Sequence, residues 1–411
     1  MTTATRPLTE RENKALAIAT HTQLVRKPNN TWIVPSQSGP KTYTVNPDPE
    51  SPSCDCPDFE HRRLRCKHVL AVEIILQRKV VSDGQTQTVT ETVTVKKTYA
   101  QDWQSYNAAQ QTEKSHFLAF LYELCSKIEE PIQVMGRPRI SLKDMLFAVT
   151  YRTYTMMSAR RFASDMRDAL AKGYVKRAPS FNSVFHYSQM ESLTPYLKLL
   201  IAESAKPLQS IETDFAVDAS GFSTCNYVRW FDVKYGKNES WHDWVKMHLV
   251  CGVKTHIVTG VEITTATKHE SPLYKGLLDQ TAKAGFTMRE VSADKGYISQ
   301  KNLQATVDMG AAPFIPFRSN VQPDRGTDLW SKMFFYYNYK RDEFYQHYHK
   351  RSNVETTFSM IKAKFGERLR SRTETAQVNE ALAKVLAHNL CVIIQSMYEL
   401  NITPEFMSDV A

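Results

Sequence analysis

The sequence contains no hydrophobic run long enough to cross a bilayer. A membrane-spanning helix needs about 18 consecutive apolar residues, and no such stretch occurs. The N-terminal segment also lacks the apolar core of a signal peptide, because charges at Arg6, Arg11 and Lys14 interrupt it. These absences predict a cytoplasmic protein that has no membrane partner.

Cysteine is scarce and unevenly spread. The chain has 7 cysteines, and three of them, Cys54, Cys56 and Cys66, lie within one short segment. The other four are scattered through apolar stretches: Cys125, Cys225, Cys251 and Cys391. An odd, uneven set in a reducing compartment argues against a disulfide framework and indicates a metal site together with buried thiols.

Negative charge is in deficit. Lys and Arg number 52 against 43 Asp and Glu, which leaves a net charge of +9. This excess indicates a polyanionic partner such as nucleic acid, although a mildly basic soluble enzyme would also have it. A hydrophobic content of 42% is ordinary for a globular protein, and 411 residues are enough for two or three domains.

A compact pattern of cysteine and histidine follows two predicted strands at 31–36 and 41–45. Cys54 and Cys56 are followed, after nine intervening residues, by Cys66 and His68 at the entry of an amphipathic helix. Thiolates and imidazole suit a tetrahedral structural Zn²⁺. Residues 25–80 resemble the SWIM zinc finger, in which a CxC pair precedes a CxH pair. His61 is the rival fourth ligand, and a chance set of reduced cysteines is the alternative.

Basic residues stand in two exposed-looking segments. Arg62 and Arg63 begin a run between the two ligand pairs, and their charges either meet DNA phosphates or are simply solvated. Arg137 and Arg139 lie in a Gly-Arg-Pro-Arg stretch that resembles an AT-hook core. A turn at the entry of the next helix explains that stretch equally well.

Four regions are predicted along the chain, and the fold class is multi-domain α+β. Residues 1–80 form a small ββα zinc module, and the Thr- and Val-rich residues 81–99 form a linker or an exposed strand. Residues 100–207 are predicted to be helical, with 158–190 forming either a helix-turn-helix-like DNA-binding unit or part of a plain bundle. Residues 208–400 alternate strands with helices.

Two aspartates in the last region follow apolar strands. Asp218 and Asp294 each close such a strand, and a glycine-containing turn comes after each of them. Asp214 is the rival of Asp218 on the same strand face, and Asp243 lies in a polar loop. Carboxylates at the ends of adjacent strands can converge and bind a hard divalent cation.

Four spaced residues further along the chain complete this set. Tyr348, Arg351, Glu355 and Lys362 lie at offsets of three, seven and fourteen from the first. On a helix of ~100° per residue they fall within an arc of roughly 60°. The spacing resembles the Tyr-Arg-Glu-Lys signature of a branch of DDE transposases from bacterial insertion sequences. The alternative is a solvated, salt-bridged helix face.

The resemblance implies an RNase H-like catalytic core over 210–395, with a mixed sheet and helices. Asp218, Asp294 and Glu355 would then bind two Mg²⁺ (or Mn²⁺) ions, and the other three signature residues would bind the DNA backbone. The implied activity is cleavage at transposon ends and strand transfer into target DNA, by a homodimer on double-stranded DNA. A nuclease without strand transfer and a non-catalytic DNA-binding descendant are the alternatives.

The spacing of the acids bears on the mechanism as well. Only 60 residues, 295–354, separate Asp294 from Glu355, which leaves no room for the large β-rich insertion that some family members carry there.

Trp230, Trp241 and Trp244 would either stack on bases exposed at a cleaved end or pack into the core, and tryptophan is mostly buried.

Overall fold

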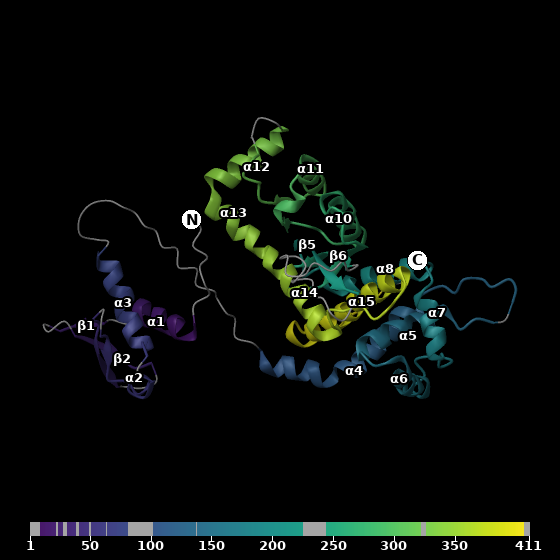
Figure 1. Ribbon diagram of the computed structural model, residues 1–411, viewed down its shortest axis with the longest axis horizontal. Helices are drawn as coiled ribbons and strands as arrows, with labels where there is room; N and C mark the ends of the chain where they lie inside the picture. The colour runs from purple at the N-terminus through teal and green to yellow at the C-terminus, as the bar shows by residue number, and fades with distance from the viewer. Residues whose placement is uncertain are drawn as a thin grey trace. The chain divides into compact units, whose positions relative to one another are not determined.

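The chain forms two compact units, one within residues 1–100 and one within 101–411 (Figure 1). A computed structural model describes residues 9–21, 24–27, 31–37, 41–48, 51–62, 64–80, 102–136, 138–224, 244–321 and 326–406. Several sequence-based expectations lie outside the described residues: those for Arg63, Arg137, Cys225, Trp230, Trp241, Asp243 and the linker at 81–99.

The first unit is a small antiparallel sheet packed with helices. Its strands pair in chain order, and they are β1 (Val25–Arg26), β2 (Trp32–Pro35), β3 (Thr42–Asn46) and β4 (Ser53–Cys54). Its helices are α1 (Glu10–His21), α2 (Pro57–Arg62) and α3 (Lys67–Val80). The two predicted strands and the helix after the cysteines are confirmed, whereas β1 and β4 are too short to leave a sequence pattern.

Alternation of side chains explains how β2 forms. Trp32 and Val34 are buried while their strand neighbours are only partly so, as in a strand with one face on a core. Val45 of β3 and Ile18 of α1 join the same cluster. The core of this unit is small, and small cores need a further source of stability such as a bound metal.

The second unit is built on a mixed sheet in the order β7-β6-β5-β8-β9. Its strands are β5 (Asp214–Ser223), β6 (Trp244–Gly252), β7 (Val258–Thr265), β8 (Glu290–Ala293) and β9 (Ala312–Phe314). β5, β6 and β7 are antiparallel neighbours, whereas β8 and β9 extend the sheet in parallel from β5. This is the RNase H-like order, and the predicted mixed sheet is confirmed.

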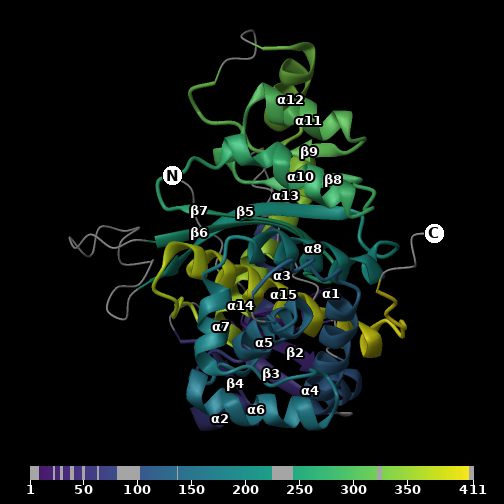
Figure 2. The same ribbon diagram turned by 90° about the vertical axis from the view of Figure 1, so that its right-hand side faces the viewer.

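Helices cover both faces of this sheet (Figures 1 and 2). On one side lie α10 (Tyr274–Lys283) and α11 (Gln300–Asp308). On the other lie α8 (Leu193–Ala205), α14 (Ser352–Phe365) and α15 (Glu374–Glu399). Between β9 and α14 the chain forms α12 (Asp328–Tyr339) and α13 (Arg341–Tyr348), so the described part of 295–354 holds helices and the short β9.

The region before the sheet is helical, as expected. Besides α8 it contains α4 (Trp103–Ser126), α5 (Leu142–Thr155), α6 (Ala159–Ala171) and α7 (Phe181–Ser188). Side-chain oxygens fix three of the starting points, because Asp102, Ser141 and Ser180 accept backbone N–H groups of the first turns of α4, α5 and α7. These helices share one hydrophobic core with the sheet. The boundary expected near residue 207 remains a prediction.

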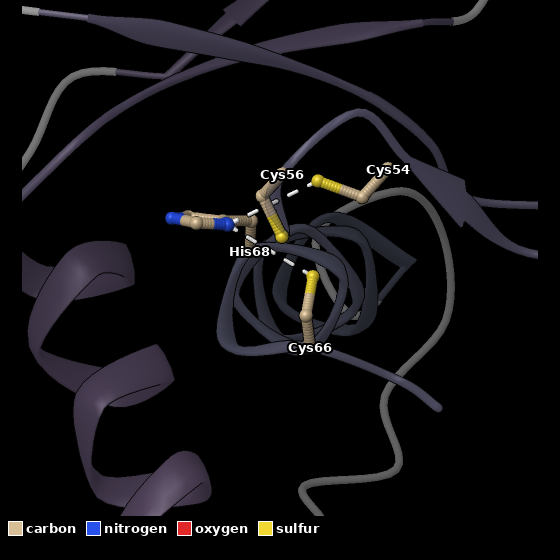
Figure 3. Close-up of side chains that lie close together, drawn as sticks. All are labelled: Cys54, Cys56, Cys66 and His68. Carbon is tan, nitrogen blue, oxygen red and sulfur yellow. Dashed lines mark hydrogen bonds between the residues drawn. The ribbon is translucent and has the colours of Figure 1, made fainter. Parts of the chain in front are cut away.

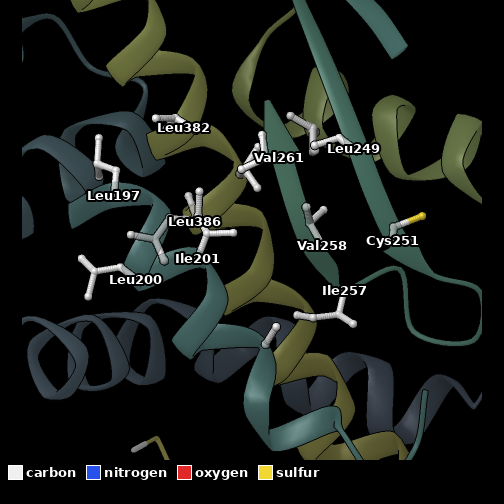
Figure 4. Close-up of a cluster of buried hydrophobic side chains, with 14 of the residues drawn as sticks. Leu197, Leu200, Ile201, Leu249, Cys251, Ile257, Val258, Val261, Leu382 and Leu386 are labelled. Atoms are coloured by element: carbon white, nitrogen blue, oxygen red, sulfur yellow. The ribbon is translucent and has the colours of Figure 1, made fainter. Parts of the chain in front are cut away.

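Helix α15 is the central element of that core. Leu382 and Leu386 pack between Leu197 and Ile201 of α8 and Val258 and Val261 of β7 (Figure 4): all of these side chains are buried. By length and composition α15 could cross a bilayer, but 78% of its apolar window is buried within the protein. It is therefore a core helix, which explains its apolar composition.

Asn389 of α15 is a polar anchor inside the core, and its replacement by leucine should destabilise the second unit. Its side chain accepts a hydrogen bond from Val258 N at 2.9 Å and donates to Val258 O, Ile201 O and Ser204 Oγ. Asn389→Leu leaves these buried groups unpaired, which should cost on the order of 3–5 kcal/mol. Urea unfolding measures the loss. Gln395→Leu on the same helix is the control, since the side chain of Gln395 bonds Glu399 in the next turn and no other side chain in the described part of the chain.

Candidate functional site

Two aspartates lie side by side at the centre of the mixed sheet. β5 and β8 are parallel with Val217 opposite Ala293, so the next residues along the two strands are Asp218 and Asp294. Ala219 N donates to Asp218 Oδ1 at 2.8 Å. Asp294 precedes the short 3₁₀ turn Lys295–Tyr297. The strand register therefore brings two of the predicted carboxylates together. The prediction that each acid closes its strand holds for Asp294, which follows β8, but is wrong for Asp218, because β5 continues to Ser223 in its pairing with β6.

Glu355, the third predicted carboxylate, is joined to this pair by an arginine. It stands in the first turn of α14, a helix that packs on β5 and β6. Arg351 Nη1 lies 2.6 Å from Asp218 Oδ2, and Arg351 Nη2 lies 2.5 Å from Glu355 Oε1. One guanidinium thus links carboxylates from the sheet and from the helix.

The electrostatics of Asp218 suit a site that binds a cation. The pKa of Asp218 is raised to about 6, mainly by burial and also by the nearby Asp294 and Glu270, while the Ala219 N–H and Arg351 oppose the shift. Asp218 and Asp294 are partly buried, whereas Glu355 is exposed. Carboxylates that lie close together out of full contact with water ionise together more readily when positive charge balances them. Oxygen donors of this kind fit Mg²⁺ or Mn²⁺, so the residues present suit the implied metal.

Asp214, the rival of Asp218, belongs to a separate ion-pair network. Arg289 donates to both of its oxygens at 2.8 and 2.9 Å, and Lys350 Nζ lies 2.8 Å from Oδ2. Although burial acts in the opposite direction, these hydrogen bonds lower the pKa of Asp214. Lys350 also pairs with Glu290 at 2.6 Å. Asp214 is therefore an ionised partner of fixed cations at the start of β5.

The remaining signature residues lie along the same edge of β5. The Arg351 guanidinium is 5.8 Å from the centre of the Tyr348 ring. Lys362 Nζ donates to Ser220 Oγ at 3.0 Å, two residues along β5 from Asp218, and burial lowers the pKa of Lys362. Tyr348 ends α13 and a 3₁₀ turn precedes α14, so the expected single helix is interrupted once.

An open cleft of about 940 Å³ is lined in part by Asp294 and Tyr348. Its other walls combine aromatic rings with cations: Phe317, Phe334, Tyr337 and Tyr345, with Lys295, Arg318 and Arg341. The aromatic stretch in α12 does not predict this cleft from the sequence. The other wall of the cleft comes from the segment after β9. Trp244 does not line the cleft and is buried at the start of β6.

Two further polar side chains near the carboxylates were not expected from the sequence. Glu270, in the loop after β7, pairs with Lys246 of β6 at 2.6 Å. Tyr297 is fully buried in the turn after Asp294. Neither stands at a strand end or in a spaced motif, so only the tertiary fold places them near Asp218.

In the first unit, the four predicted zinc ligands converge (Figure 3). The ligand atoms of Cys54, Cys56, Cys66 and His68 all lie within 4.8 Å of one another, and all four residues are buried. His68 Nδ1 lies 3.9 Å from the sulfurs of both Cys54 and Cys66. These spacings and donor types suit one tetrahedral Zn²⁺. His61 is exposed on α2 and does not belong to the cluster.

The hydrogen bond between Cys54 and Cys66 favours ionisation of one thiol at the expense of the other. Hydrogen bonding with Cys66, together with burial, raises the pKa of Cys54. The same hydrogen bond lowers the pKa of Cys66 to about 4, helped by His68. Three thiolates can therefore coexist here only with a bound cation.

The other predicted DNA-binding residues lie on the surface. Arg62 is exposed at the end of α2, 3.6 Å from Asp58. Arg139 is exposed ahead of α5, and its backbone and Nε groups donate to Gln133 Oε1. Neither has a contact that assigns it a ligand, so their DNA-binding role stays a prediction.

Two family models match the chain. The model described as "Transposase DDE domain" matches residues 209–390, which include the mixed sheet and helices α10 to α14. The model described as "SWIM zinc finger" matches residues 43–77, which include the cysteine and histidine cluster. No solved structure matches the chain. The chain therefore carries a transposase DDE domain and, ahead of it, a SWIM zinc finger.

Proposed function

We propose that this protein is a transposase that cleaves DNA at the ends of a mobile element and joins those ends to target DNA. The observation that supports this most directly is that Arg351 links Glu355 of α14 to Asp218 of β5, whose strand neighbour β8 leads into Asp294. Three carboxylates beside a fixed guanidinium are suited to a metal and a phosphodiester. We further propose that the chain belongs to the branch with the Tyr-Arg-Glu-Lys signature.

Each side chain of the site has a distinct task in this proposal. Asp218, Asp294 and Glu355 would hold the divalent metal, which supplies a Lewis acid for attack on the phosphodiester. Arg351 presents a planar pair of donors that suits the oxygens of a phosphate. Lys362, on the same side of β5, adds a second positive charge for the DNA backbone.

The cleft beside Asp294 supports a path for a DNA strand to the carboxylates. Its aromatic walls can stack on bases, and its cations can contact phosphates. Because Asp294 and Tyr348 line the cleft, a strand lying in it would reach one of the three acids. The exposed Arg62 and Arg139 would make further contacts with double-stranded DNA. Joining two element ends would require two subunits, so we propose a homodimer.

The proposed zinc site would have a structural task. Cys54, Cys56, Cys66 and His68 form a closed, buried set with no position open for substrate, as in structural zinc sites. Their ion would hold β4 to the start of α3, because the ligands come from these two places.

Incubation of the purified protein with the DNA that flanks its gene, in Mg²⁺, tests the proposed function. We expect nicks or breaks at the element ends, followed by products in which those ends are joined to a target duplex. Cleavage without joined products would identify a nuclease instead. Binding without cleavage in either Mg²⁺ or Mn²⁺ would identify a DNA-binding protein and contradict the proposal.

The salt dependence of DNA affinity should report the contacts of Arg351 and Lys362. Replacing both by glutamine should reduce the slope of log affinity against log salt by roughly two units, because each phosphate contact contributes about one. Fluorescence anisotropy over a range of salt concentrations measures the slope. Lys275→Gln with Lys283→Gln, both on α10, is a control of equal charge. An unchanged slope in the first variant would exclude both residues from the DNA interface.

A further inference from the structure

A second layer of polar groups lies beside the three carboxylates. Lys246 Nζ pairs with Oε1 of Glu270 at 2.6 Å. The other oxygen, Oε2, faces the turn that follows Asp294: a Cβ at Gly296 would lie only 3.0 Å from it. Glycine at this position therefore allows the turn to approach Glu270 closely.

Tyr297 ends the same turn, and its backbone is fixed. Its N–H donates to Asp294 O at 2.9 Å, and its carbonyl accepts from Asn302 Nδ2 at 2.7 Å. The ring is fully buried and packs against Tyr274, with centroids 5.7 Å apart. The side chain is thus held in place by contacts other than those of its hydroxyl.

The Tyr297 hydroxyl has no hydrogen-bond partner among the described residues. Burying a hydroxyl without a partner is costly, so phenylalanine would serve better at a position that only fills space. Tyr274 gives the contrast, since it is equally buried and its hydroxyl bonds Thr306 Oγ1 at 3.0 Å. The unpaired hydroxyl of Tyr297 therefore indicates a ligand.

The surroundings of the Tyr297 hydroxyl indicate which kind of ligand this is. Burial raises the pKa of Tyr297 far above its usual value, and Glu270, Asp218 and Asp294 each raise it further. The phenol therefore lies close enough to all three carboxylates to be affected by their charge, and it stays protonated as a hydrogen-bond donor. A donor among acids suits water molecules that a cation holds in the same place, since Mg²⁺ keeps several waters.

We infer that Tyr297 and Glu270 are positioning residues that bind the water shell of the divalent metal held by Asp218 and Asp294. The Tyr297 hydroxyl donates to one such water, and Glu270 Oε2 accepts from the shell while Lys246 fixes Oε1. This inference rests on the proposed function, because it requires the carboxylates to bind a divalent metal. Partners of this kind commonly change metal affinity by about 10- to 100-fold.

Binding of Mn²⁺ to the full-length, zinc-loaded protein tests the inference without measuring activity. Electron paramagnetic resonance follows the loss of the free Mn²⁺ signal. Tyr297→Phe and Glu270→Gln should each weaken Mn²⁺ binding by about tenfold. Tyr274→Phe should leave it unchanged. Wild-type affinity in Tyr297→Phe or in Glu270→Gln would overturn the inference for that residue.

Thermal unfolding without Mn²⁺ separates a positioning role from a structural one. Tyr297→Phe should unfold at the same temperature as the wild type or above it, because only an unpaired hydroxyl is lost. Tyr274→Phe should unfold at a lower temperature, because it loses the bond to Thr306. A lowered temperature for Tyr297→Phe would indicate a structural hydroxyl and contradict the inference. Asp218→Asn distinguishes the two proposals: if it also binds Mn²⁺ normally, the proposed metal site itself is wrong.

Discussion

Asp218→Asn should reduce cleavage of end-containing DNA by roughly three orders of magnitude. The substitution removes a carboxylate from the proposed metal site and with it several kcal/mol of electrostatic stabilisation, at about 1.4 kcal/mol per tenfold in rate. Asp294→Asn and Glu355→Gln should have effects of the same order. DNA affinity should persist or rise, because a negative charge beside the phosphate is lost. Single-turnover cleavage in Mg²⁺, measured beside a binding curve, separates the two quantities.

The rival aspartate provides a matched control for these variants. Asp214 lies on the same strand, four residues earlier, but its oxygens are occupied by Arg289 and Lys350. Asp214→Asn should therefore lower stability while cleavage stays near the wild-type rate. Near-normal cleavage by any of the three site variants would remove that residue from the proposed site. Loss of cleavage in a fully folded Asp214→Asn would transfer the role to Asp214.

Cys66→Ser should release zinc and unfold the first unit while the second unit stays folded. Binding of structural zinc in small modules is worth about 10–16 kcal/mol at neutral pH, and much of it is folding free energy. The core of this unit rests on few side chains, among them Trp32, Val34 and Val45. Elemental analysis should therefore fall from about one zinc per chain to near zero.

Limited proteolysis locates the damage caused by Cys66→Ser. Residues 9–80 should become sensitive to cleavage, while residues 102–406 should resist it as in the wild type. Cys125→Ser is the control, since Cys125 is equally buried but lies alone in α4. Retention of zinc and of protease resistance in Cys66→Ser would rule out Cys66 as a ligand.

The zinc cluster and the central sheet could be predicted because their signals are local. The four ligands lie within one short segment of the chain. The loops of that segment bring them together, and no distant residue is needed. The strands of the sheet are apolar runs bounded by turns. Asp294 follows the end of β8, whereas Asp218 lies inside β5, which continues to Ser223. Parallel pairing of β5 with β8 then places these acids side by side.

Other parts of the site depend on contacts between distant segments. Arg351 was expected to bind DNA, and nothing in its spacing indicates that it also links Asp218 to Glu355. Glu270 lies in a polar loop, and Tyr297 resembles any aromatic residue of a turn. Only the tertiary fold brings Glu270, in the loop after β7, close to the turn at Gly296 that follows Asp294. No periodicity or motif in the sequence predicts this kind of side-chain placement.

The position of α15 at the end of the second unit affects how the chain folds while it is being synthesised. Thr112 of α4 bonds Tyr398, 286 residues later, and Thr194 of α8 bonds Asn379, 185 residues later. At typical translation rates, α4, α5 and α8 leave the ribosome on the order of ten to thirty seconds before α15 can cover them.

Throughout that interval the nascent chain presents apolar helix faces to the solvent, and contacts so distant in sequence also form slowly. The zinc finger has no such delay, because its ligands and its sheet are complete within the first 80 residues. Premature termination before residue 374 would therefore leave a folded finger attached to an aggregation-prone chain. The yield of active protein should accordingly depend on chaperones more than on zinc supply.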